Sequence, residues 1–208
     1  MAAVAIVFAI AFGFASRPAW AEDFGRGAAL FDLCATCHAA DGSGNRLYGA
    51  PAIAGMGEWY ITAQLEKFRN GLRGAHPDDV NGLRMRPMSR TLASDADVAA
   101  VAAFVASLPA TRPAPVLSGG DPIKGKALYI TCGACHGVNG EGLQPLNGPS
   151  LNRTNDWYLI DQLRKYKAGI RGGSPADVPG ILMRPMALAL PDEQAMKDVL
   201  AHIATLPE

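Results

Sequence analysis

The chain has 208 residues, of which 49% are hydrophobic and 18% are charged. This is the composition of a folded protein with room for one or two domains, and it excludes a disordered chain. Lysine plus arginine and aspartate plus glutamate number 19 each, so there is no basic excess of the kind that predicts a nucleic-acid partner.

The N-terminal stretch has the pattern of a secretory signal peptide. Residues 2–15 form an apolar run, which is too short for a bilayer span of about 20 residues. Ala19-Trp20-Ala21 follows as a small-residue cleavage site. We predict that residues 1–21 are removed on export to the periplasm. A late start codon or an uncleaved anchor is the alternative, because only the Met1 amine is positive there. Membrane association is expected only through partners or through an uncleaved N-terminus.

A first helix is predicted near residues 25–35, and it leads into Cys34-Ala35-Thr36-Cys37-His38. C-x-x-C-H is the signature of c-type haem attachment, in which both thiols bond to the porphyrin and the histidine binds the iron. A lone C-x-x-C also occurs in zinc sites and redox dithiols. A second copy at Cys132-Gly133-Ala134-Cys135-His136 uses the remaining cysteines. The sequence therefore predicts two haem c groups, attached at Cys34, Cys37, Cys132 and Cys135 and bound by His38 and His136.

A loop with a proline follows each haem motif, at Pro51 and at Pro149. We expect the proline carbonyl to accept the Nδ1–H of the preceding histidine, which would fix the tautomer of an iron ligand. An ordinary loop proline is the alternative.

A middle helix is predicted from Trp59 to a G-x-R-G stretch at residues 71–74, with a copy from Trp157. Arg73 and its repeat Arg171 are candidates to pair with haem propionates, because a guanidinium matches a carboxylate. A solvated arginine is equally compatible with the pattern.

The sixth iron ligand is expected in the stretch M-R-P-M, found at residues 85–88 and 183–186. The first methionine lies 47 residues after the haem-motif histidine in both copies. A thioether is a neutral ligand that raises the reduction potential. His76 and His202 have no counterpart in the other copy and are expected to be surface or packing residues. The residues alone leave open which methionine of each pair binds, and the other is expected to pack on the ring.

A last helix is predicted from near Ser94, with a copy from near Asp192. The two copies align at a fixed offset of 98 positions without a gap, as from Cys34 to Cys132. A segment at 111–120 with two prolines and a Gly pair separates them as an extended linker. We therefore predict an all-α chain with domains at 22–110 and 121–208, each built of three helices around long loops.

These motifs together resemble a di-haem class I cytochrome c, and most closely the cytochrome c4 family. The resemblance covers residues 23 to 207 and rests on the tandem C-x-x-C-H, the G-P-x-L-like loop at 148–151, the W-Y-x-x-x-Q-L helix, and the G-x-R and M-x-x-M stretches. Ala50 departs from the loop pattern at its first position. The resemblance implies two tandem cytochrome c domains about a pseudo-two-fold axis, electron transport in the periplasm, and Met85 and Met183 as iron ligands.

An iron with both axial positions filled has no open site for a substrate, which favours an electron carrier over an enzyme. The expected partners are transient: a cytochrome bc-type complex or a dehydrogenase as donor and a terminal oxidase as acceptor. The alternative is a haem c subunit of a larger dehydrogenase or oxidase complex. A di-haem enzyme such as a peroxidase is disfavoured, because it needs one openable haem and both copies carry methionines.

Overall fold

The structure is a computed structural model that describes residues 19–207 of the chain. The predicted signal peptide, residues 1–21, lies almost entirely outside them. Within 19–207 the secondary structure is helical, with two isolated β-bridges and no strand. No helix in this range is both long and apolar enough to cross a membrane. The all-α prediction is confirmed.

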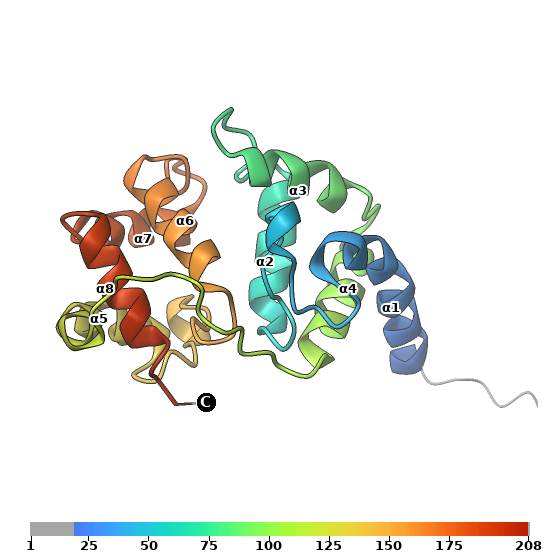
Figure 1. The fold of residues 1–208 in the computed structure, drawn as a ribbon. Helices are drawn as coiled ribbons and strands as arrows, with labels where there is room; N and C mark the ends of the chain where they lie inside the picture. The colour runs from blue at the N-terminus through green and yellow to red at the C-terminus, as the bar shows by residue number, and fades with distance from the viewer. Residues whose placement is uncertain (1–18, 208) are drawn as a thin grey trace, which may run out of the picture.

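The helices form two successive sets with the same order (Figure 1). The N-terminal set comprises α1 (Ala19–His38), the 3-10 helix η1 (Arg46–Tyr48), α2 (Glu58–Arg69), α3 (Val80–Arg90) and α4 (Asp95–Ser107). The C-terminal set comprises α5 (Pro122–His136), η2 (Gln144–Leu146), α6 (Asp156–Lys167), α7 (Val178–Leu188) and α8 (Glu193–Ile203).

The prediction of three helices in each domain was wrong, because the methionine stretch is helical in both. It forms α3 and α7, although each contains a proline, Pro87 or Pro185. A proline removes one backbone hydrogen bond from a helix. Each helix is fixed at its start by an aspartate cap: Asp79 accepts from the Gly82 N–H and Asp177 from the Gly180 N–H, both at 3.1 Å. This cap satisfies a free N–H of the first turn and so stabilises the helix at its start, separately from the hydrogen bond that the proline removes further along.

In each domain the first helix packs on the last, α1 on α4 and α5 on α8. Glycines permit the close crossing, because a Cβ on Gly27 would collide with the Ala100 carbonyl and one on Gly125 with the Asp198 carbonyl. The last helices supply much of the two cores. Their buried apolar residues include Val98, Val101 and Val105 in α4 and Met196, Val199 and Ile203 in α8.

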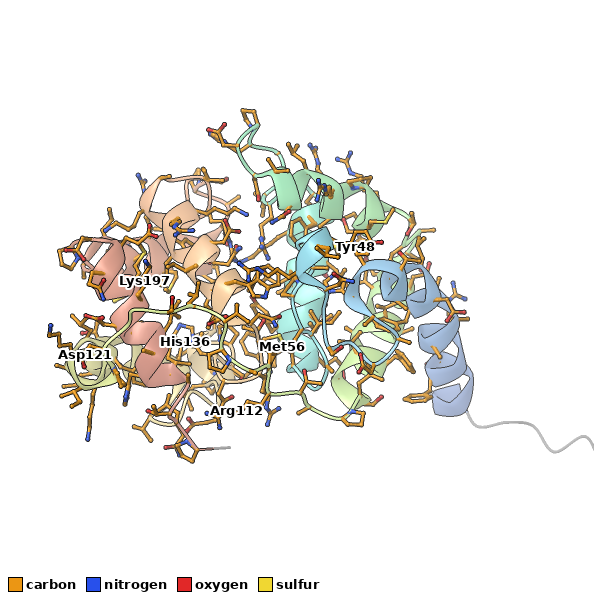
Figure 2. All side chains as sticks on the ribbon, viewed as in Figure 1. Tyr48, Met56, Arg112, Asp121, His136 and Lys197 are labelled. Atoms are coloured by element: carbon orange, nitrogen blue, oxygen red, sulfur yellow. The ribbon has the colours of Figure 1, made fainter. Side chains whose placement is uncertain are left out.

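The linker is extended, and hydrogen bonds attach it to the C-terminal domain. The N–H groups of Val116 and Leu117 both donate to the Asp156 carboxylate at 2.7 Å. Arg112 donates to the Ala204 carbonyl at 2.9 Å, reaching the C-terminal domain from the linker (Figure 2). These bonds hold in place a segment that its prolines extend and that its Gly pair would otherwise leave flexible at one end.

Candidate functional site

One cavity of about 530 Å³ reaches through both domains and contacts both haem motifs. Its wall is mainly apolar and comes from the haem-motif helices, the proline loops, α2, α3, α6 and α7. That volume and lining are typical of a cofactor site. The site residues expected from the sequence that line this cavity are Cys34, Cys37, His38, Pro51, Arg73, Met85, Cys132, Cys135, His136, Pro149, Arg171 and Met183.

Both haem-motif histidines are buried and held by the following proline loop. Nδ1–H of His38 donates to the Pro51 carbonyl at 2.8 Å, and Nδ1–H of His136 donates to the Pro149 carbonyl at 2.7 Å. Burial lowers the pKa of both histidines, and these hydrogen bonds only partly oppose it. Each imidazole is therefore neutral with Nε2 free to accept a metal ion, which is the form that an iron ligand needs.

Cys34 and Cys132 lack the environment of a catalytic thiolate, and the described residues form no zinc-type cluster of ligands. Burial raises the pKa of the Cys34 and Cys132 thiols, whereas reactive thiolates have a lowered pKa. Among residues 19–207, no three His, Cys, Asp or Glu side chains gather closely enough to bind a metal ion by themselves. A cofactor that brings its own four nitrogen ligands and takes the thiols as attachment points fits this arrangement better than bare zinc.

The four methionines of the two M-R-P-M stretches all line the cavity. Helical structure explains this, because residues three apart in a helix share a face. Met85 and Met88 therefore point to the same side of α3, and Met183 and Met186 to the same side of α7. Met85 is only partly exposed and also packs against the N-terminal core, whereas Met186 is 38% exposed.

Arg73 and Arg171 are buried where the two domains meet, and two glutamines join them in a ring. Each guanidinium donates to the glutamine of its own domain at 2.8 Å, Arg73 to Gln64 and Arg171 to Gln162. Each also donates across the interface, Arg73 to Gln162 at 3.2 Å and Arg171 to Gln64 at 3.4 Å. Neither arginine is a solvated surface residue, as one alternative had it.

Asp79 and Asp177 interact electrostatically with the arginines of this ring, but each forms its salt bridge with a lysine instead. Within 19–207, no carboxylate pairs with Arg73 or Arg171, and the Nε atom of each is buried without a hydrogen-bond partner. Burial alone would raise the pKa of the neighbouring Tyr158, but the two arginines outweigh it and lower that pKa. Buried charges require a partner. Two buried cations that line the cavity therefore fit a cofactor carrying carboxylates, as haem does.

Two reciprocal ion pairs, which no sequence motif predicted, lie beside this ring. Lys67 of α2 pairs with Asp177 at 2.6 Å, and Lys165 of α6 pairs with Asp79 at 2.8 Å. Lys67 and Asp79 of the first copy correspond to Lys165 and Asp177 of the second, so the two pairs are equivalent and the interface has pseudo-two-fold symmetry. Helix α2 faces α6 across the middle of the molecule (Figure 1). The sequence did contain a sign of these pairs, because the lysine and the aspartate are both repeated at the offset of 98.

The two histidines without a counterpart in the other copy do not line the cavity. His76 is exposed and its Nδ1 lies 3.7 Å from the Asp78 carboxylate. His202 packs edge-on against Tyr129, and its pKa is lowered by partial burial. They are a surface and a packing residue, in agreement with the expectation.

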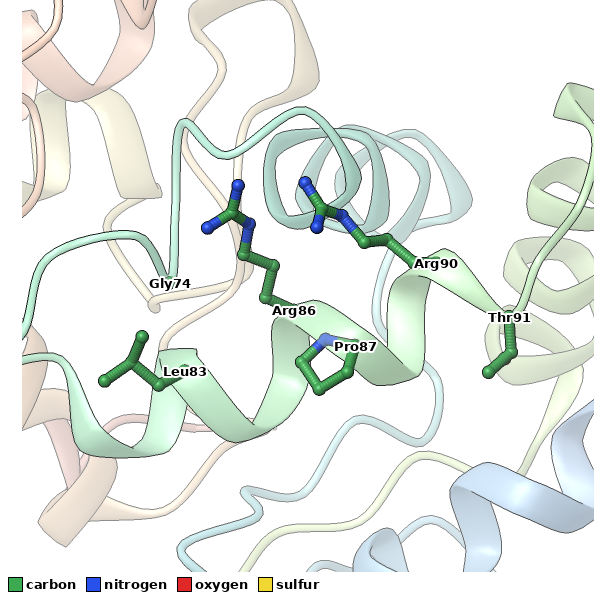
Figure 3. A pocket seen from close by; sticks show the side chains of 6 residues that line it. All are labelled: Gly74, Leu83, Arg86, Pro87, Arg90 and Thr91. Carbon is green, nitrogen blue, oxygen red and sulfur yellow. The ribbon is translucent and has the colours of Figure 1, made fainter.

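The methionine helices differ in charge. On α3, Arg86 and Arg90 extend to the same side of the helix and line a pocket of about 400 Å³ with Gly74, Leu83, Pro87 and Thr91 (Figure 3). Arg84 is a third, exposed arginine. On α7 the positions of Arg84 and Arg90 are taken by exposed Leu182 and Leu188. The N-terminal helix is therefore basic where the C-terminal helix is apolar.

Comparison with known proteins matches the family model "Cytochrome c" twice, at residues 24–109 and 123–207. The chain is 33% identical over 171 residues to the "Thiosulfate dehydrogenase electron acceptor" of Thiomonas intermedia, covering 77% of this chain and 73% of that protein.

Two solved structures share its fold. A thiosulfate dehydrogenase (TsdBA) from Marichromatium purpuratum has a TM-score of 0.71 and 30% identity, over 88% of this chain and 40% of that one. Reduced cytochrome c4 from Pseudomonas stutzeri has a TM-score of 0.68 and 25% identity, over 88% of this chain and 98% of that one. With the geometry of the cavity, these matches show that the chain belongs to the cytochrome c family, as a cytochrome c4-like protein with two such domains in tandem.

Proposed function

We propose that this di-haem electron carrier works in the periplasm, passing single electrons between a respiratory donor and a terminal oxidase without an enzymatic reaction of its own. The observation that carries the proposal is the symmetry of the site: each domain offers two thiols, a neutral buried histidine and a pair of methionines to one cavity. Haem bound between a histidine and a methionine supplies one-electron exchange and leaves no iron position for a substrate.

In this proposal the thiols of Cys34 and Cys37, and of Cys132 and Cys135, form the thioether bonds. His38 and His136 would each bind one of the two irons, and Met85 and Met183 would each supply a second protein ligand to the iron of their domain. The carbonyls of Pro51 and Pro149 hold the histidine tautomer, which also increases ligand basicity. Arg73 and Arg171 would neutralise the cofactor carboxylates through their buried Nε atoms, which have no hydrogen-bond partner among residues 19–207.

The charge difference between α3 and α7 supports different partners for the two domains. Exposed arginines on α3 favour an acidic protein surface, and such encounters are transient and accelerated by charge. The apolar face of α7 favours a less polar contact. Electron transfer through the N-terminal domain is therefore expected to slow as ionic strength rises, because salt screens exposed charges.

The second candidate is a dedicated electron-transfer subunit of a larger dehydrogenase. The similarity to a protein named as an electron acceptor of thiosulfate dehydrogenase, and to 40% of a solved thiosulfate dehydrogenase chain, favours it. In that case a sulfur-oxidising dehydrogenase is the donor, and this chain purifies in fixed ratio with it.

The test uses the exported protein with its cofactors. Mass spectrometry is expected to show a mass increase of two haem groups, and a spectroscopic redox titration is expected to show two low-spin haems. Copurification with a dehydrogenase in fixed ratio would favour the second candidate. A haem that is high-spin, or that binds carbon monoxide without losing a ligand, would contradict both candidates and favour an enzyme.

A further inference from the structure

Each reciprocal ion pair at the domain interface joins one domain to the methionine helix of the other. Asp79 is the residue that caps α3, and its salt-bridge partner is Lys165 on α6 of the C-terminal domain, which also pairs with Asp161 of its own helix at 2.6 Å. Asp177 caps α7, and its cation is Lys67 on α2 of the N-terminal domain. Each capping carboxylate thus has a cross-domain ammonium as its ion-pair partner.

The same carboxylate oxygen serves both contacts. Oδ1 of Asp79 accepts from the Gly82 N–H at 3.1 Å and from Lys165 at 2.8 Å, and Oδ1 of Asp177 accepts from Gly180 at 3.1 Å and from Lys67 at 2.6 Å. A side chain at Gly82 or Gly180 would collide with the capping carboxylate. The glycines therefore let the carboxylate lie on the first turn of the helix and still face the other domain.

Burial makes the cation necessary. Asp79 and Asp177 are 2% and 1% exposed, and Lys165 is 7% exposed. Leaving such a carboxylate without its cation is strongly destabilising, because it becomes an uncompensated buried charge. The salt-bridge partner of each capping carboxylate therefore comes from the other domain, and the arginine of its own domain, Arg73 or Arg171, acts on it only through a charge interaction without a salt bridge.

We propose that Lys165 positions Met85 and that Lys67 positions Met183, so that each domain holds the methionine ligand helix of the other. The proposal rests on the proposed function in one respect, that these methionines bind iron. The two lysines are positioning residues: they touch a helix cap, and the cap sets the start of α3 or α7. The expected signature is crossed, since a substitution in one domain disturbs the ligand helix of the other.

The experiment uses the full-length protein with both haems and the variants Lys165→Met and Lys67→Met. Amide hydrogen exchange reports on the caps through the Gly82 and Gly180 N–H groups. NMR of the reduced protein reports on ligation through the methyl signals of the iron-bound methionines. Each signal is assigned by its loss in Met85→Ala or Met183→Ala.

Lys165→Met is expected to speed exchange at the Gly82 N–H by at least about tenfold and to shift or broaden the Met85 methyl signal. It is expected to leave the exchange at Gly180 and the Met183 signal unchanged. Lys67→Met is expected to give the mirror result.

Arg164→Met is the matched control. It removes one positive charge from the same helix, α6, but Arg164 pairs with Glu193 on its own domain. It is expected to leave both caps unchanged. If Lys165→Met fails to fold, the double variant Lys165→Met/Asp79→Asn replaces it, because asparagine still caps a helix and needs no cation. This variant is expected to fold and to regain slow exchange at Gly82.

Effects confined to the mutated domain, or present at neither cap, would overturn the proposal. So would fast exchange at Gly82 in the double variant. The failure of the proposed function looks different: methyl signals of iron-bound methionine would then be absent from the unaltered protein, whatever the exchange rates are.

Discussion

The proposed methionine ligand of each domain can be tested by substituting one methionine at a time. Replacing Met85 by Ala is expected to lower the reduction potential of the N-terminal haem, because a thioether ligand raises it. The charge-transfer band of methionine-ligated ferric haem is expected to lose the part of its intensity that comes from the N-terminal haem. Optical redox titration measures both. Met88→Ala is the control, since it shares a helix face with Met85 and is expected to affect packing only. The opposite pattern would assign the ligand to Met88.

Acid is expected to weaken the chain through Asp79. Burial alone would raise the pKa of this carboxyl, but Lys165 and the Gly82 N–H outweigh burial and lower it. A carboxyl with a lowered folded-state pKa stabilises the protein above its unfolded pKa of about 3.9, and this stability is lost as pH falls through the folded value. In Asp79→Asn the pH dependence of the unfolding free energy below pH ~4 is expected to shrink, by up to about 1.4 kcal/mol per pH unit. Urea unfolding at several pH values measures it. An acid limb as steep as in the unaltered protein would refute the role of Asp79.

At the scale of helices, α4 begins with a capping box. The Ser94 hydroxyl accepts from the Asp97 N–H at 3.1 Å, and the Asp97 carboxylate accepts from the Ser94 N–H at 3.1 Å. Ser94→Ala is expected to destabilise the N-terminal domain by about 1 kcal/mol, which chemical denaturation measures. Ser107→Ala, at the exposed end of the same helix, is the control and is expected to have little effect. Equal losses in both variants would exclude a capping role.

The sequence predicted some helices and missed others for a physical reason. The helices at Trp59 and Ser94 follow from apolar spacing and a capping residue. The methionine helix was overlooked because Pro87 and Pro185 are expected to end a helix. The aspartates that cap it, Asp79 and Asp177, are polar residues before its first turn, so the spacing of apolar residues does not reveal them. The repeated residues of the cavity were found because C-x-x-C-H is a chemical signature. The Lys–Asp pairs were missed because they join residues 110 and 86 positions apart, which no local pattern connects.

At the scale of the whole molecule, the cofactor is expected to be a part of the N-terminal core. The cavity lies among the helices of this domain. Three or four short helices bury little apolar surface unless they pack around a cofactor. Replacing Cys34 and Cys37 together by Ala is expected to prevent haem attachment there and to leave that domain unfolded, while the C-terminal domain keeps its haem. Circular dichroism and limited proteolysis measure this. Thr36→Ala, an exposed position between the two cysteines, is the control. A protease-resistant, fully helical N-terminal domain without haem would contradict the expectation.

The reciprocal arrangement of Lys67 with Asp177 and Lys165 with Asp79 is the contact that two identical subunits make in a symmetric homodimer, where each patch binds its own counterpart. Here both patches are on one polypeptide, and residues 111–120 keep them at a high effective concentration whatever the protein concentration is. The duplicated chain has thereby become free to let its halves diverge, which two copies of a single subunit cannot do. The arginines of α3 and the leucines of α7 are such a divergence, so one assembly can offer two dissimilar faces to the proteins it meets.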